Sequence, residues 1–304
     1  MSSTYGRGPR TPRKPATSAR APSKTTHVSR SAAEAALRAA ADWCRKASAV
    51  QKDGRPDDAI PLFEKALELN PHEMRAWVGV GSCLDALGRY EEALESYAEA
   101  LAIAPKDAEV WSAKGDLLER LGRHEEALRD LNRALELNPC IASAWVNQGF
   151  ARKALGNPEQ AIICYDQALK IDRRSPDVWY NRGNCLCALG RFGEALGCFN
   201  EALVLDPKDV RAWNNKGVCL AGLGRHEAAV RCYNKALAID PTYALAWRAK
   251  AVACEHLGRV PDAVQAYKQL LVVEPARDLA SIEEIQLHLR QLEAGLNPAT
   301  ERTS

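Results

Sequence analysis

Residues 176–209, PDVWYNRGNCLCALGRFGEALGCFNEALVLDPKD, and residues 210–243, VRAWNNKGVCLAGLGRHEAAVRCYNKALAIDPTY, follow one another without a gap and share one pattern. In each stretch a Trp is followed by a Gly after eleven residues and by an Ala after sixteen, and Asp-Pro comes near the end. The segment from Trp to Gly has the length of a helix, and Gly suits the left-handed residue that ends one. Apolar residues at helical spacing follow, and Asp-Pro stops this second segment. Each stretch therefore predicts a hairpin of two helices.

The same register extends over most of the chain. Its seven tryptophans are spaced 34 residues apart and mark seven units without insertion or deletion. These units are residues 40–73, 74–107, 108–141, 142–175, 176–209, 210–243 and 244–277. Prolines close six of them, and Arg173 takes that place in the fourth, which makes this unit a candidate weak point. Because one hairpin cannot bury its apolar surface alone, we expect neighbouring units to stack into an all-α array.

This pattern of Trp, Gly, Ala, an aromatic residue, Ala and Pro in 34 residues resembles the tetratricopeptide repeat. The resemblance covers 238 of the 304 residues. It implies a right-handed alpha-alpha superhelical solenoid of helical hairpins with a C-terminal capping helix. It also implies that the first helix of each hairpin lines a concave inner surface.

The segments outside the seven units have separate roles. Residues 1–30 contain seven basic and no acidic side chains and few large apolar ones, so we expect a disordered basic tail. We expect the helical array to cover residues 31–277 and to begin with an N-terminal helical extension, residues 31–39. We expect residues 278–296 to form the capping helix. Its apolar stripe consists of Ile282, Ile285, Leu289 and Leu292. Residues 297–304 are expected to form a second disordered tail.

The resemblance places a peptide-binding groove on the middle and later units. The sixth position of three consecutive units is Asn, which gives a ladder of side-chain amides that can donate to and accept from an extended backbone. Aromatic and Arg residues, the usual anchors of interfaces, lie around it. The predicted groove residues are Asn147, Phe150, Tyr180, Asn181, Asn184, Arg211, Asn214, Asn215 and Arg248. The alternative is that Asn recurs here through duplication on a solvated helix face.

No acid–base pair, nucleophile arrangement, phosphate loop or metal-ligand spacing occurs, so we expect no enzymatic activity, no cofactor, no catalytic residue and no metal site. A carboxylate clamp for chaperone C-termini, known in some relatives, lacks its three cations here. The ten cysteines in a chain without an export signal favour reduced thiols. Cysteines recur at two repeat positions, Cys83, Cys185 and Cys219 at one and Cys164, Cys198 and Cys232 at the other, which favours core packing. Cys187 is expected to be the most exposed thiol.

The function that follows is a protein–protein interaction scaffold or adaptor that binds an extended or helical peptide of a partner. We expect a cytoplasmic protein without a transmembrane segment, as a monomer or with weak self-association. The alternative is a protein tethered to nucleic acid or an anionic surface, and nucleic acid could be bound only through the basic tail, because the remainder has a net charge of −5. The tail could also be a plain solvated extension or a regulated segment.

Overall fold

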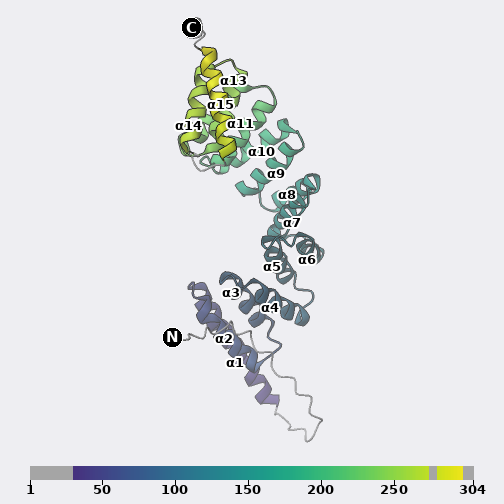
Figure 1. Ribbon diagram of the computed structural model, residues 1–304. Coiled ribbons are helices and arrows are strands. Elements are labelled where there is room, and N and C mark those ends of the chain that lie inside the picture. The colour runs from purple at the N-terminus through teal and green to yellow at the C-terminus, as the bar shows by residue number, and fades with distance from the viewer. Residues whose placement is uncertain (1–29, 274–278, 297–304) are drawn as a thin grey trace, which may run out of the picture. The chain divides into compact units, whose positions relative to one another are not determined.

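The computed structural model describes residues 30–273 and 279–296, and all regular elements in these ranges are α-helices (Figure 1). The helices fall into two units, which meet in sequence between Asn138 and Pro139. The first unit contains α1 (Arg30–Lys52), α2 (Pro56–Leu69), α3 (Met74–Ala86), α4 (Tyr90–Ile103), α5 (Ala108–Arg120) and α6 (His124–Leu137). The second unit contains α7 (Ala142–Ala154), α8 (Pro158–Ile171), α9 (Pro176–Ala188), α10 (Phe192–Leu205), α11 (Val210–Gly222), α12 (His226–Ile239), α13 (Ala244–His256), α14 (Val260–Val273) and α15 (Leu279–Leu296).

Within each unit, helical hairpins follow one another and pack together. Each odd-numbered helix packs against the next even-numbered helix, and that helix packs against the first helix of the following hairpin of the same unit. Contacts also join consecutive odd-numbered helices, as between α9 and α11 and between α11 and α13. Helices α9, α11 and α13 of the second unit therefore form one continuous row, which carries seven of the nine residues predicted to line a groove.

Glycine ends the first helix of every hairpin, as the sequence predicted. The seven turn glycines have φ values between 67° and 77°. In the turn from α3 to α4, the Gly88 N–H donates to the Asp85 carbonyl at 3.0 Å, and the Arg89 N–H donates to the Leu84 carbonyl at 2.9 Å. These bonds satisfy carbonyls at the end of the helix, and the left-handed backbone that they require favours a residue without a Cβ.

The repeated Trp joins each hairpin to the turn that precedes it. In six hairpins its indole Nε1–H donates to the backbone carbonyl six residues earlier, at 2.8–3.0 Å. The acceptor is the carbonyl of the closing Pro in five cases, as for Trp213 and Pro207. In the fourth unit Arg173 supplies the same carbonyl to Trp179 at 3.0 Å. The exchange of Pro for Arg therefore keeps this hydrogen bond.

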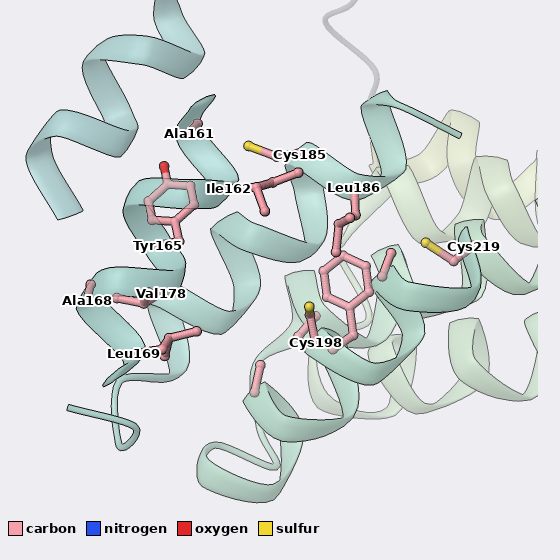
Figure 2. Close-up of a cluster of buried hydrophobic side chains, with 14 of the residues drawn as sticks. Ala161, Ile162, Tyr165, Ala168, Leu169, Val178, Cys185, Leu186, Cys198 and Cys219 are labelled. Carbon is pink, nitrogen blue, oxygen red and sulfur yellow. The ribbon is translucent and has the colours of Figure 1, made fainter. Parts of the chain in front are cut away.

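Close approach of a Gly and a large side chain sets the packing inside the hairpins. In the core of the second unit, Tyr165 and Leu186 (both labelled in Figure 2) are fully buried, as is Phe199. A Cβ built on Gly149 would lie 2.5 Å from the Tyr165 ring, and one on Gly183 would lie 2.9 Å from the Phe199 ring. Helices α7 and α9 can approach their partners this closely because these positions carry no side chain.

The last described helix, α15, covers the end of the second unit. Leu289 is buried against α13 and α14 together with Ile285 and Leu292, which confirms three of the four predicted stripe residues. The side chain of Ile282 and the tails, residues 1–29 and 297–304, lie outside the described part of the chain. At the other end α1 begins at Arg30. None of the described helices combines the length and apolar character that crossing a membrane requires.

The cysteines were predicted correctly in one respect and wrongly in two. The six cysteines at the two recurrent positions are all buried, as expected for small core side chains. However, Cys187 forms a disulfide with Cys219, whereas reduced thiols were expected. Cys187 is also not the most exposed cysteine, because it is half-buried, whereas Cys140, in the turn between α6 and α7, is exposed. The eight other cysteines, all in the described part of the chain, are not disulfide-bonded.

Candidate functional site: a polar network and an apolar hollow

The nine predicted groove residues all lie on odd-numbered helices of the second unit. Asn147 and Phe150 are on α7, three residues are on α9, three are on α11, and Arg248 is on α13. The 34-residue period explains this placement, because equal positions in successive units fall on equivalent helices. The structure brings only some of these side chains into contact.

Four of them form a hydrogen-bonded group between α9 and α11, which we call the polar network: Tyr180, Asn184, Asn214 and Asn215. The Asn215 amide nitrogen donates to Asn184 Oδ1 at 2.7 Å and to the Tyr180 hydroxyl at 3.2 Å. Asn214 donates to Asn215 Oδ1 at 3.0 Å. Both N–H groups of the Asn215 amide are therefore used inside the protein. Within the described part of the chain, neither the Tyr180 hydroxyl hydrogen nor the Asn184 amide nitrogen donates a hydrogen bond, so both remain as donors.

Arg211 closes one end of the polar network, and it is not an unpaired cation. Its guanidinium stacks over the Tyr180 ring, with 4.7 Å from Cζ to the ring centroid. It also forms ion pairs with Asp209 at 3.0 Å and with Asp177 at 3.1 Å. The hydrogen bond to Asp209, followed by the one to Asp177, raises the pKa of Arg211 although burial opposes the rise. Arg211 orients Tyr180, and its charge is compensated by the two carboxylates.

All three asparagines of the predicted ladder interact with other residues of the protein. Asn181 donates to the backbone carbonyl of Asp177 at 2.8 Å and accepts from Lys153 Nζ at 3.4 Å. Asn147 is half-buried and also has an interaction within the chain. Equal positions in successive units therefore do not give three equally available amides.

Two further predicted residues lie outside the polar network. The ring of Phe150 meets the Tyr165 ring edge to face at a centroid distance of 5.9 Å and packs against the core. Arg248 is half-buried on α13, and among the described residues no hydrogen bond or ion pair links it to Tyr180, Asn184, Asn214 or Asn215. Phe150 thus serves the core as much as the surface.

An apolar depression of about 340 Å³, which we call the α11–α13 hollow, is lined in part by Val218, three residues after Asn215 on α11. Val218 and Val252 are 41% and 43% exposed, which leaves aliphatic surface available for contact. His226 and His256 stack at a centroid distance of 4.6 Å with ring planes 11° apart. The lining residues are Val218, Ala221, His226, Tyr233, Ala249, Val252, Ala253 and His256.

The α11–α13 hollow was not predicted from the sequence, although a signal was present. Val218 and Val252 occupy the ninth position of consecutive units, a position that the resemblance assigns to the inner surface. The residues predicted to line the groove were polar, charged or aromatic, so the prediction did not include these two valines. The stacked histidines come from α12 and α13 and could not be paired by a rule that considers only the first helix of each hairpin.

Comparison with known families matches the repeats directly. Models described as "Tetratricopeptide repeat" match residues 50–117, 108–139, 176–209, 210–243 and 232–265, and one described as "TPR repeat" matches residues 149–186. Two of these ranges, 176–209 and 210–243, are the fifth and sixth units predicted from the sequence. Among curated proteins, none matches this chain.

Solved structures share the fold. The crystal structure of YrrB, described as a TPR protein with an unusual peptide-binding site, is 26% identical, with a TM-score of 0.57 over 62% of this chain and 97% of YrrB. PilF of Pseudomonas aeruginosa is 20% identical, with a TM-score of 0.61 over 68% of this chain and 94% of PilF. The C-terminal part of a TPR repeat-containing protein from Cytophaga hutchinsonii is 18% identical, with a TM-score of 0.64 over 77% of this chain and 96% of that structure.

These similarities agree with the hairpins that stack in each unit, and they confirm the predicted class, an all-α solenoid of repeated helical hairpins. The repeat matches between residues 50 and 265 and the hairpins that they cover show that the chain belongs to the tetratricopeptide-repeat family.

Proposed function

We propose that this protein is an interaction scaffold whose second unit binds an extended peptide segment of a partner protein along α9, α11 and α13. The observation that carries the proposal is that the polar network and the α11–α13 hollow share α11, where Val218 of the hollow follows Asn215 of the network by three residues. A peptide needs both kinds of surface, because its backbone must exchange hydrogen bonds and its apolar side chains gain from leaving water.

The free donors of the polar network define how the backbone would dock. A peptide carbonyl can accept from the Tyr180 hydroxyl or from the Asn184 amide without displacing the bonds that Asn215 makes. Arg211 holds the Tyr180 ring in place, so these donors are positioned before the ligand arrives. Such preorganisation reduces the entropy lost on binding.

The α11–α13 hollow defines which side chain the ligand presents. Valine and alanine side chains form most of its lining, and the two stacked histidines are also among the lining residues. An aliphatic side chain fits this surface, whereas a charged one would lose hydration without gaining a partner. YrrB, whose structure is described by its peptide-binding site, supports the general class of ligand.

The test uses a random-peptide display library, because the partner is unidentified. The full chain is the bait, and peptides enriched on it are assayed by fluorescence anisotropy against Val252→Arg, which fills the α11–α13 hollow with a cation. The matched control is Val204→Arg, because Val204 is a 75% exposed valine on the even-numbered helix α10.

We expect peptides with an aliphatic residue, at least tenfold weaker binding to Val252→Arg, and unchanged binding to Val204→Arg. Tyr180→Phe should weaken the same peptides by removing one donor while keeping the ring under Arg211. Peptides that bind all four proteins equally would refute the groove on the second unit. Enrichment of an RNA pool by the full chain, lost when residues 1–30 are removed, would instead favour the nucleic-acid alternative.

A further inference from the structure

The disulfide between Cys187 and Cys219 joins two first helices of neighbouring hairpins, α9 and α11. The two residues are 32 positions apart in sequence, and their Cα atoms are 6.7 Å apart. Cys187 is half-buried, whereas Cys219 is completely buried. A molecule from solution therefore has access to one sulfur of the pair and not to the other.

The disulfide lies in line with the polar network. Cys187 follows Asn184 by three residues on α9, and Cys219 follows Asn215 by four on α11, so each cysteine is about one helical turn beyond its Asn. The Asn215–Asn184 hydrogen bond and the Cys187–Cys219 bond are thus successive links between the same two helices. The ion pair between Arg211 and Asp177 is a further link at the opposite end.

The repeat register explains why this pair is formed here and at no other hairpin junction in the described second unit. Cys219 occupies the tenth position of its unit, and Cys187 occupies the twelfth position of the unit before it. Cys185 also occupies the tenth position, but the twelfth position of the preceding unit is Lys153. Lys153 is close enough to oppose the rise in the pKa of Cys185 that burial causes. The two positions are therefore neighbours in both places, and only α9 and α11 carry sulfur at both.

We propose that Cys187 and Cys219 are a reversible thiol–disulfide site that exchanges with low-molecular-weight thiols and sets how firmly α9 and α11 are held together. A small thiolate attacks Sγ of Cys187, the sulfur–sulfur bond breaks, and Cys219 leaves with the electron pair and takes up a proton. A second small thiolate attacks the small-molecule sulfur of the mixed disulfide and releases Cys187, which is protonated. Two small thiols are oxidised to one small-molecule disulfide, and oxidation of the pair is the reverse.

The state of this site affects the polar network because both lie between the same helices. With the disulfide closed, α9 and α11 are held at the separation that the Asn184–Asn215 bond requires, and the donors on Tyr180 and Asn184 stay in position. With the disulfide open, only noncovalent links resist their separation. This consequence rests on the proposed function, and it predicts that the oxidised form binds a groove peptide several-fold more tightly than the reduced form.

The test follows the site itself before any ligand is used. The purified full chain is equilibrated in buffers with graded ratios of reduced to oxidised glutathione, quenched with acid, alkylated and digested with trypsin. Trypsin releases residues 183–191, which contain Cys185 and Cys187, and residues 217–225, which contain Cys219. We expect these two peptides to be linked in oxidising buffer, to separate in reducing buffer in one two-electron transition, and to stay separate in Cys187→Ser.

The matched control is Cys185→Ala, because Cys185 is the buried cysteine at the position equivalent to Cys219 (both labelled in Figure 2). This variant must keep the link. Absence of the link in oxidising buffer, loss of the link in Cys185→Ala, or a link that persists at every glutathione ratio would each overturn the proposal. Circular dichroism verifies that both variants are folded, and Cys187→Ala replaces Cys187→Ser if the latter is not.

The effect on binding is then measured with a peptide selected on the groove, for the oxidised and reduced wild type and for Cys187→Ser. Equal affinity of the two redox forms would remove the coupling to the groove and leave the exchange site intact. Failure to select any groove peptide would count against the proposed function alone, because the mass-spectrometric result does not depend on it.

Discussion

Substitution of Ala for Gly at two helical positions of the second unit should change stability in opposite directions. In Gly217→Ala the new Cβ would lie 2.4 Å from Cε1 of Tyr233 and 2.8–2.9 Å from two other atoms of that ring. Carbon atoms that are not bonded prefer separations of about 3.5–4 Å, so the ring would have to move by roughly 1 Å. Tyr233 is 1% exposed, so a movement of its ring would disturb the side chains packed around it.

The magnitude follows from two opposing effects. Overpacking of this kind costs about 1–3 kcal/mol, and the better helix propensity of Ala returns up to about 1 kcal/mol. We expect Gly217→Ala to lower the free energy of unfolding by roughly 1–2 kcal/mol. Gly197, in the middle of α10, is exposed and has no atom within 4 Å of an added Cβ, so Gly197→Ala should raise it by about 0.5–1 kcal/mol.

The assay is equilibrium unfolding in urea, followed by the helical circular-dichroism signal and by Trp fluorescence. Both variants should keep the wild-type slope, so that a change in midpoint reports stability. If Gly217→Ala were as stable as Gly197→Ala, the close approach of α11 to Tyr233 would not be a constraint on the hairpin, and the account of the helical glycines would be refuted.

Three further predictions concern the Trp, the disulfide and a buried Tyr. Trp179→Ala removes the hydrogen bond to the Arg173 carbonyl and contacts with the core, so it should lower the free energy of unfolding in urea by about 3–5 kcal/mol. Trp43→Ala, in the terminal hairpin, should lower it less. Reduction should lower the unfolding free energy of the wild type by about 3–4 kcal/mol, the chain-entropy estimate for a loop of this length, and should leave Cys187→Ser unchanged. Burial raises the pKa of Tyr97 to about 12. The unfolded chain therefore loses this proton at lower pH than the folded one, so the stabilisation is full below about pH 10 and is lost as pH rises toward about 12. Tyr97→Phe should lose stability less steeply over that range, and an equal slope would contradict the assignment.

The helices could be predicted from the sequence because their determinants are local. Gly88 follows the end of α3 and has a positive φ. Its position in the 34-residue period was enough to predict this turn. The role of Trp179 was less visible. Its indole bonds to a backbone carbonyl, so the side chain of Arg173 at the acceptor position carries no information about the bond. The fourth unit was predicted to be a weak point because Arg173 replaces Pro. The hydrogen bond from Trp179 does not involve the Arg173 side chain, because its acceptor is the backbone carbonyl.

The candidate site was predicted in position but not in its contacts. Asn181 and Asn215 hold the same place in neighbouring units, yet the amide of Asn181 donates to its own helix and that of Asn215 donates to α9. Such choices depend on which side chains face each position across the helix pair, and a period within one chain does not specify them. The disulfide was missed for the same reason, since 32 residues separate Cys187 from Cys219 and their proximity depends on two different repeat positions.

The indole hydrogen bond has a consequence for how such a chain can evolve. The donor stands at the start of one hairpin, and the acceptor is a main-chain carbonyl at the end of the hairpin before it, as for Trp111 and Pro105. Any segment that begins with this Trp and finishes with this turn has the hydrogen-bond donor at one end and the matching acceptor at the other. A duplicated, deleted or exchanged module can therefore be joined to its new neighbour at once, without a compensating mutation elsewhere in the gene.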